Sequence, residues 1–195
     1  SPATLRFTPG DWSTPQSVTV TGVDDNLADG TPSYSIVLAA AVSLDLAYDG
    51  FDPADVTPVT TTDDDTPGVI VSEAALSVAE DGGTGGFTVR LNSEPTGDVI
   101  IDVVSLATGV ATVTPAILSF MPGNWSDPQT VTVMGVNDDV DNNPDLTATI
   151  ALTMNAATVD SAYLSADPAD VLVTVTDDLV DGATIVSDLS SLLAD

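Results

Sequence analysis

Carboxylates are the side chains whose number and spacing in this sequence suggest chemistry. They occur in short clusters, at Asp24-Asp25, Asp63-Asp64-Asp65, Glu80-Asp81, a run rich in Asp and Asn over 137–145, and Asp177-Asp178. The sequence has no Lys and no His, so carboxylates that converge would repel one another strongly unless a cation joins them. Ca²⁺, a hard cation that takes about six to eight oxygen ligands, suits Asp, Glu and Asn side chains best. The alternative is that the clusters are solvated turns, in which Asp and Asn are good turn formers.

The composition excludes several classes of partner. The 30 acidic residues, of which all but Glu73, Glu80 and Glu94 are Asp, stand against only Arg6 and Arg90, for a formal net charge of −28. This charge repels nucleic acid and anionic lipid, and no stretch approaches the roughly 20 apolar residues of a membrane span. We therefore expect no nucleic-acid partner and no membrane insertion. Disorder is not expected either, because 43% of the residues are hydrophobic.

The residue types also argue against an enzyme. Without His, Cys or Lys there is no Ser-His pair, no thiolate and no amine nucleophile. Paired carboxylates could hydrolyse glycosides, but here they recur in near-identical copies rather than in one cleft. The same absences rule out disulfides and lysine isopeptide crosslinks, which leaves calcium as the main remaining way to stiffen the protein.

Internal repetition organises the chain. The segment from Leu5 to Val20 has the pattern Phe-x-Pro-Gly-Asp-Trp-Ser-x-Pro-Gln. It returns 113 positions later from Leu118 to Val133, with Asn124 in place of Asp11. Ile70-Val71-Ser72-Glu73 similarly returns as Ile185-Val186-Ser187-Asp188. A period of this length suits a small domain. We expect residues 1–65 to be the C-terminal half of one repeat, 66–178 a complete repeat, and 179–195 the first strand of a further repeat.

The elements that must position the carboxylates are β-strands. Short runs rich in Val, Thr and Ile alternate with Gly, Pro, Asn and Asp, and no helical periodicity is present. The predicted fold is all-β, a tandem of antiparallel seven-stranded β-sandwiches of the immunoglobulin-like kind. In the complete repeat the predicted strands are 69–79, 86–91, 98–104, 117–121, 129–136, 146–153 and 171–176; in the first they are 4–8, 16–23, 33–39 and 56–62, and the tail supplies 183–193.

Strand direction predicts where the carboxylates meet. Successive strands of such a sandwich run in opposite directions, so the first, third, fifth and seventh strands end at one pole. Acidic residues follow three of these four strands, and the matching places in the first repeat are acidic as well. The clusters are therefore expected to share a pole in each repeat.

The ordered set of motifs resembles the Calx-β domains, which are calcium-binding sandwiches. The resemblance rests on Val78-Ala79-Glu80-Asp81-Gly82-Gly83, on the Val-Thr-Val strand before the acidic loop, and on Thr62 to Gly68 (Thr-Asp-Asp-Asp-Thr-Pro-Gly). The Trp-containing repeat resembles the version in large bacterial surface adhesins. By this resemblance the calcium ligands are Glu80, Asp138, Asp139, Asp177 and Asp178 in the full repeat, and Asp24, Asp25, Asp63 and Asp64 in the first. One departure is Ala107-Thr108-Gly109-Val110, where the exchanger domains of this family carry an acid.

These inferences predict a calcium-stiffened structural repeat of an extracellular or cell-surface fibre or giant adhesin. Its expected partners are neighbouring repeats or copies of itself, with head-to-tail assembly by exchange of the strand at 183–193 as one route. The alternatives are an adhesin module that binds a surface glycan or protein, and a calcium-responsive regulatory domain. Trp12 and Trp125 are expected to close one end of each sandwich, and Asp52 to Asp55 and Asp167 to Asp170 to form Pro-containing turns rather than a shared ion site at the domain junction.

Overall fold

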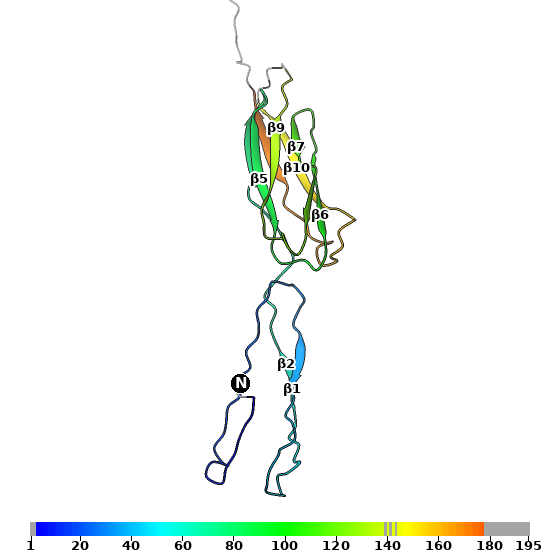
Figure 1. The fold of residues 1–195 in the computed structure, drawn as a ribbon. Helices are drawn as coiled ribbons and strands as arrows, with labels where there is room; N and C mark the ends of the chain where they lie inside the picture. The colour runs from blue at the N-terminus through cyan, green and yellow to red at the C-terminus, as the bar shows by residue number, and fades with distance from the viewer. Residues whose placement is uncertain (1–2, 139, 141, 143, 178–195) are drawn as a thin grey trace, which may run out of the picture. The chain divides into compact units, whose positions relative to one another are not determined.

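The structure, a computed structural model, describes residues 3–138, 140, 142 and 144–177. The chain forms two compact units with the boundary between Asp65 and Thr66, and each is described here by itself (Figure 1). Two of the predicted ligands, Asp139 and Asp178, lie outside the described residues, as does the predicted strand at 183–193. The described part of the chain contains no helix long and apolar enough to cross a membrane.

The second unit is a β-sandwich, which confirms the predicted all-β fold class. Figure 1 shows its two sheets facing each other. One sheet has five strands, in the order β4 (Ala75–Ala79), β11 (Val171–Thr176), β10 (Leu146–Met154), β6 (Val99–Ser105) and β8 (Ile117–Phe120). The other has four, in the order β3 (Val69–Val71), β5 (Thr84–Leu91), β9 (Gln129–Gly135) and β7 (Ala111–Thr114). Neighbouring strands are antiparallel except β4 and β11, which are parallel.

Side-chain alternation produces the core between these sheets. In β5, Phe87, Val89 and Leu91 are buried, whereas Thr88 and Arg90 between them are partly exposed. A strand places successive side chains on opposite faces, so each strand contributes its apolar set to the interior. The same alternation in the other strands gives one continuous apolar cluster shared by both sheets. This core fixes the positions of the loops at the two ends of the sandwich.

The predicted strand 69–79 is in fact two strands that belong to different sheets. β3 pairs with β5, and β4 pairs with β11. Ser72 is still held to the four-stranded sheet, because its hydroxyl accepts the Thr88 amide at 2.8 Å. The Ala74 carbonyl already accepts the Leu172 amide of the five-stranded sheet. The chain therefore crosses between the sheets at Glu73.

A further strand, β7, occupies a region that the sequence pattern predicts to be a loop. The segment from Ala107 to Val110 forms a turn, with a hydrogen bond from the Val110 amide to the Ala107 carbonyl. The four residues that follow pair with β9 and bury Ala111. Four residues that include one Ala and two Thr are too short and too weakly apolar to stand out as a strand in the sequence.

In its described residues, 3–65, the first unit has one two-stranded antiparallel sheet, formed by β1 (Ser33–Ile36) and β2 (Val56–Thr60). Residues 4–8 and 16–23, predicted as strands, are not strands here. Their counterparts in the second unit, β8 and β9, pair with β6 and with β5 and β7. The described part of the first unit contains counterparts of β8 to β11 only, so these segments lack the partners that would make them strands.

The repeated Trp-containing segment makes the same local hydrogen bonds in both units. Asp11 accepts the Thr8 amide, and the pKa of Asp11 is lowered mainly by this bond. Asn124 accepts the Met121 amide in the same way at 2.6 Å. The amides of the two equivalent glutamines also bind equivalent carbonyl groups, from Gln16 to Arg6 and from Gln129 to Ser119. This motif therefore closes the turn between β8 and β9 in the second unit, and the equivalent turn in the first unit.

The two tryptophans of this segment differ in burial. Trp125 is half-buried and packs against the core of the second unit, and its carbonyl accepts the Leu91 amide. Trp12 is 71% exposed. The expectation that both tryptophans close a sandwich end is therefore wrong for Trp12, because the described first unit has no counterpart of the strand that carries Leu91.

Candidate metal centre

Three strand ends of the second unit bring Glu80 and Asp138 together. The Glu80 amide donates to the Thr176 carbonyl at 2.9 Å, which fixes the residue after β4 against the end of β11. The Gly135 amide donates to the Gly83 carbonyl at 3.0 Å, which fixes the end of β9 beside the same segment. The Asp138 amide then donates to the Glu80 carboxylate at 3.0 Å. The ends of β4, β9 and β11 thus meet at one pole, as the strand directions predict.

Glu80 is unusual among these acids because it is only 2% exposed. A carboxylate is rarely so buried unless it is hydrogen-bonded or binds a cation. The Asp138 amide supplies one hydrogen bond to Oε1. A carboxylate has several lone pairs, so this bond leaves Glu80 able to serve as a ligand as well.

The loop after β9 connects Asp138 to Asp177. The side-chain amide of Asn142 donates to the Asp138 carboxylate at 3.1 Å, and the backbone amide of Asn142 donates to the Asp177 carboxylate. The Asp177 amide in turn contacts the carboxylate of Asp145 at 3.4 Å. Asn142 therefore bridges two of the predicted ligands, Asp138 and Asp177. Asp145 was not among the predicted ligands, although its place in the acidic run 137–145 was a signal for it.

The first unit reproduces this loop arrangement with its own residues. Asp25 accepts the amide of Leu27 at 3.0 Å, as Asp138 accepts that of Val140 at 3.0 Å. Asp63, which follows the last strand of its unit as Asp177 does, accepts the amide of Gly30 at 2.6 Å, although its counterpart by the repeat is Asp178. In both units, therefore, one acid closes the start of the acidic loop on itself, and an acid that follows the last strand binds a backbone amide of that loop.

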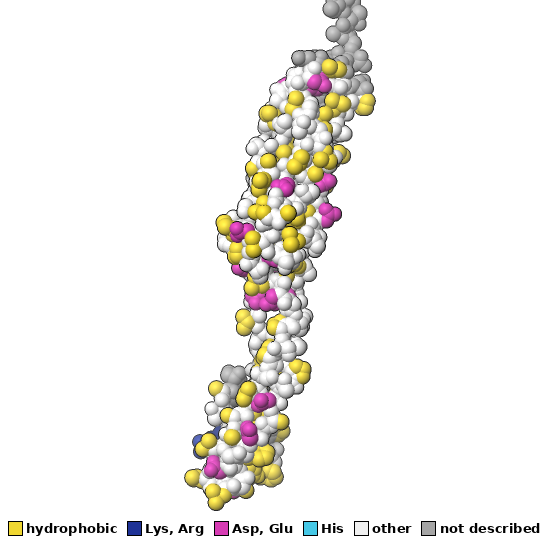
Figure 2. Space-filling view, turned by 90° about the vertical axis from the view of Figure 1, so that its right-hand side faces the viewer, with side chains coloured by type: hydrophobic (Ala, Val, Ile, Leu, Met, Phe, Trp, Pro, Cys, Tyr) yellow, Lys and Arg dark blue, Asp and Glu magenta, His cyan; other side chains and the backbone are white. Residues whose placement is uncertain are grey.

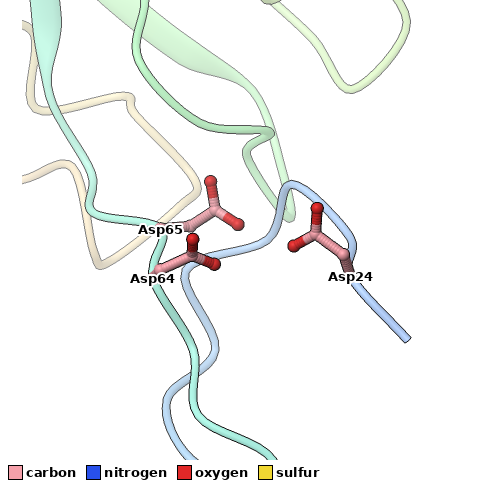
Figure 3. A group of neighbouring side chains, drawn as sticks. All are labelled: Asp24, Asp64 and Asp65. Atoms are coloured by element: carbon pink, nitrogen blue, oxygen red, sulfur yellow. The ribbon is translucent and has the colours of Figure 1, made fainter. Parts of the chain in front are cut away.

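Within the first unit, Asp24, Asp64 and Asp65 form the tightest acidic group of the described residues. One carboxylate oxygen from each lies within 4.8 Å of the others (Figure 3). Asp24 comes from the loop that precedes β1, and Asp64 and Asp65 follow β2. All three line a pocket of about 260 Å³ together with Asp25 and Asp63. The structure thus brings Asp24 and Asp64 together as a pair of predicted ligands, while Asp25 and Asp63 line the same pocket and bind backbone amides.

Asp65 belongs to this group although it was not among the predicted ligands. The signal for it was the run Asp63-Asp64-Asp65 itself, whose last member the resemblance did not assign. Partial burial raises the pKa of Asp65, and the charges of Asp64, Asp63, Asp24 and Asp25 raise it further. The raised pKa of Asp65 means that its ionised form is disfavoured at this place. A cation in the pocket would remove that penalty.

The acids at the other end of the repeat have a structural explanation. Asp55 accepts the Leu38 amide at 2.9 Å, and Asp170 accepts the equivalent Leu152 amide at 3.2 Å. Both act as fixed acceptors for the turn in their own unit, in line with the predicted Pro-containing turn.

The donor set at both acidic poles consists of oxygen atoms. Carboxylate and amide oxygens at several positions around one point are the ligands that Ca²⁺ prefers, and Mg²⁺ would require stricter geometry. The acids of the first unit therefore fit a calcium ion, and Asp24, Asp64 and Asp65 would hold it. In the second unit the described acids that would hold an ion are Glu80, Asp138 and Asp177, which hydrogen bonds link, although no three acids among the described residues of that unit come as close together.

Comparison with known proteins gives distant structural matches. No protein-family model matches the chain, and no curated protein matches it significantly. Among solved structures, the apo-form Calx CBD1 domain is 18% identical over 57% of this chain and 98% of that chain, with a TM-score of 0.42. The S-layer protein SbsC domains 4 and 5 are 22% identical over 63% of this chain and 52% of that chain, with a TM-score of 0.37. The E. coli chaperone DraB is 11% identical over 60% of this chain and 58% of that chain, with a TM-score of 0.40. The similarity is distant and concerns the fold.

Proposed function

We propose that this protein is a calcium-stiffened structural repeat of an extracellular fibre or large surface adhesin. The observation that carries the proposal is that both units gather carboxylates at the loops after equivalent strands, where these carboxylates bind backbone amides of the acidic loop. Asp25 and Asp63 hold the loop in the first unit as Asp138 and Asp177 do in the second. Solvated turns need no such convergence, and the sequence has no Lys or His to neutralise it.

The role is structural rather than catalytic. Without a cation, the carboxylates at the ends of these strands repel one another. A cation bound at each pole would remove this repulsion and link the strand ends. Since disulfides and lysine crosslinks are excluded by composition, bound calcium is the device by which a chain of such repeats becomes stiff. A long, stiff and highly acidic array suits an extracellular setting, where free calcium is abundant, and its partners are neighbouring repeats or further copies of the protein.

The direct test is thermal unfolding of the full chain in EDTA and in millimolar calcium. An ion bound only by the folded state adds about 2.7 kcal/mol when its concentration is a hundred times the dissociation constant, so the melting temperature should rise. The double variant Asp138→Asn with Asp177→Asn should lose the rise that belongs to the second unit, because Asn keeps the hydrogen bonds but removes the charge. The charge-matched control is Asp127→Asn with Asp167→Asn, two exposed acids outside the poles. Equal melting curves in EDTA and calcium would refute the proposal.

Stiffness is a separate claim from binding and needs its own measurement. Small-angle scattering of the full chain should give a longer and better-defined particle in calcium than in EDTA. If calcium raised the melting temperature but the scattering were identical in both conditions, the protein would bind calcium without being stiffened by it, and the stiffening role would be refuted.

A further inference from the structure

We propose that the side chain of Asn124, in the turn between β8 and β9, is an acceptor for an N-linked glycan. The group attached would be an oligosaccharide transferred from a lipid-linked diphosphate donor. The proposal rests on the extracellular setting of the proposed function, because N-linked glycans mark surface loops of secreted proteins.

The sequence contains one acceptor motif for this modification. The motif is Asn-x-Ser or Asn-x-Thr, with any residue except Pro in the middle. Of the seven asparagines in the chain, only Asn124 fits it, followed by Trp125 and Ser126. A motif of three residues often arises by chance, so the argument depends on whether the structure exposes the acceptor nitrogen and tolerates its modification.

The turn uses the side-chain oxygen of Asn124 and leaves the nitrogen unused. Oδ1 accepts the Met121 amide at 2.6 Å, which fixes the orientation of the side chain, since a backbone amide only donates. Nδ2 has no hydrogen-bond partner among the described residues. In the same part of the chain no buried side-chain nitrogen or oxygen lacks a partner, so Nδ2 must reach solvent.

Other asparagines of the second unit use their nitrogen within the protein. Their side-chain nitrogens donate hydrogen bonds of 2.8 to 3.1 Å; these residues are Asn92, Asn142 and Asn155. A sugar on any of these nitrogens would disturb an internal bond. Asn124 combines the motif with a nitrogen that the fold does not use.

The surface beside the turn has room for a sugar. Ser126 and Gly123 are exposed, and a β-carbon added at Gly123 would meet no atom within 4 Å beyond its chain neighbours. Met121 is 48% exposed. On the face that Figure 2 shows, the second unit has hydrophobic side chains scattered among uncharged ones, with isolated acids and no Lys or Arg. A bulky, hydrophilic glycan at this turn would cover exposed hydrophobic side chains such as Met121.

The first unit shows that the turn itself does not require Asn. The counterpart of Asn124 there is Asp11, whose carboxylate accepts the Thr8 amide in the same way. Trp12 and Ser13 follow it, as Trp and Ser follow Asn124. A carboxylate has no nitrogen to take a glycan, so the chain contains the same turn with and without the acceptor atom.

The modification is compatible with the fold atom by atom. A bond forms between Nδ2 of Asn124 and the anomeric carbon of the first sugar. The bond from that carbon to the donor's diphosphate breaks, the lipid diphosphate leaves with the electron pair, and one amide proton is released. Oδ1 takes no part, so it still accepts the Met121 amide in the product. The turn precedes β9 and the acidic pole follows it, so the glycan and the calcium site lie at opposite ends of the strand.

The test is secretion of the full chain, behind a cleavable signal peptide, from a eukaryotic cell that holds the transferase and its donor. A flexible C-terminal tag with an established acceptor sequence reports whether each chain met the transferase. Mass spectrometry should find a glycan on Asn124, and enzymatic removal of the glycan should leave Asp at that position. An unmodified Asn124 in chains whose tag is glycosylated would overturn the proposal.

Matched variants separate the motif from the turn. Asn124→Asp should lose the glycan and keep the melting temperature of the unmodified chain, because Asp11 shows that a carboxylate closes the same turn. Ser126→Ala should also lose the glycan. Asp11→Asn completes the motif in the first unit and should gain one. Modification that persisted in Ser126→Ala, or a glycosylated chain that did not fold, would contradict the proposal.

Calcium binding is measured on the same samples. The glycosylated and the enzymatically deglycosylated chains should show equal rises in melting temperature with calcium, since the glycan lies away from the acidic pole. Absence of the glycan with a normal calcium response would overturn this proposal alone. A glycan on Asn124 with equal melting in EDTA and calcium would support it and refute only the calcium role.

Discussion

The carboxylate of Glu80 accepts a hydrogen bond from the backbone amide of Asp138, 58 positions further along the chain, at 3.0 Å. This contact joins the residue after β4 to the acidic loop after β9. It also holds a buried carboxylate in place at the acidic pole.

Glu80→Gln tests whether this buried carboxylate binds calcium. Gln keeps a side-chain oxygen that can accept the Asp138 amide, so the structure in EDTA should be little changed. Loss of the charge should weaken calcium binding in the second unit by about tenfold or more, because ligand charge tunes calcium affinity. Calorimetric titration with calcium measures this directly. Glu94→Gln, at a part-buried position near the other end of the sandwich, is the control and should leave affinity unchanged.

Asp65 should report the calcium site of the first unit through its titration. Burial and four neighbouring carboxylates raise the pKa of Asp65 above its ordinary value. Between the ordinary and the raised pKa the folded state binds more protons than the unfolded chain, so this group's contribution to stability falls as pH rises through that window. At neutral pH its charge opposes folding.

Carbon NMR of the Asp65 carboxyl group checks this behaviour. We expect half-ionisation above the ordinary pKa in EDTA, and a lower pKa in calcium, since a bound cation favours the ionised form. The carbon chemical shift of the Asp52 carboxyl group, an exposed acid away from the pocket, should not respond to calcium. If the pKa of Asp65 were the same in calcium and in EDTA, calcium would not bind beside Asp65.

Tyr163→Phe and Tyr48→Phe form a matched pair across the repeat. Tyr163 is buried and its hydroxyl bonds Ser93, so its removal leaves buried polar groups of Ser93 unpaired. This should cost about 1–3 kcal/mol in the free energy of unfolding of the second unit. The same change at Tyr48, which is exposed, should cost close to nothing. Chemical denaturation of both variants compares the two costs.

Gly135→Ala tests the close approach of β9 to the end of β4. The added β-carbon would lie 2.2 Å from the Ala79 carbonyl oxygen, so the backbone must move. We expect a loss of about 1–3 kcal/mol in stability, as for overpacked sites, together with weaker calcium binding, because the movement separates Glu80 from Asp138. Gly123→Ala is the control, since nothing lies within 4 Å of its added carbon. Full stability of the Gly135 variant would show that the two strand ends are not rigidly joined.

The sequence predicts the sandwich because its signals are local and repeated. Alternation in β5 and β9 assigns faces directly, and the 113-residue repeat makes each motif visible twice. The crossing at Glu73 could not be predicted, since Val71 and Leu76 both read as strand residues and only their partners in three dimensions differ. Strand β7 was missed for a related reason: its pairing with β9 stabilises it more than its own composition does.

The candidate sites were predictable in location but not in detail. Strand direction places Glu80, Asp138 and Asp177 at one pole from the sequence alone. Which oxygen atoms face one another depends on loop hydrogen bonds, such as those of Asn142, that no spacing rule encodes. In the first unit those bonds occupy Asp25 and Asp63 and leave the unassigned Asp65 beside Asp24 and Asp64.

The parallel pairing of β4 with β11 has a mechanical consequence. The chain enters the second unit ahead of β4 and continues beyond β11, so a pull along the chain draws the two strands past each other lengthwise. The contacts from Ala75 and Leu172 to Ala79 and Thr176 would then bear load together instead of opening one after another. This is a shear geometry, which suits a module that must carry tension, because rupture requires several backbone hydrogen bonds between β4 and β11 to break at once. The acidic pole lies at the C-terminal end of both strands.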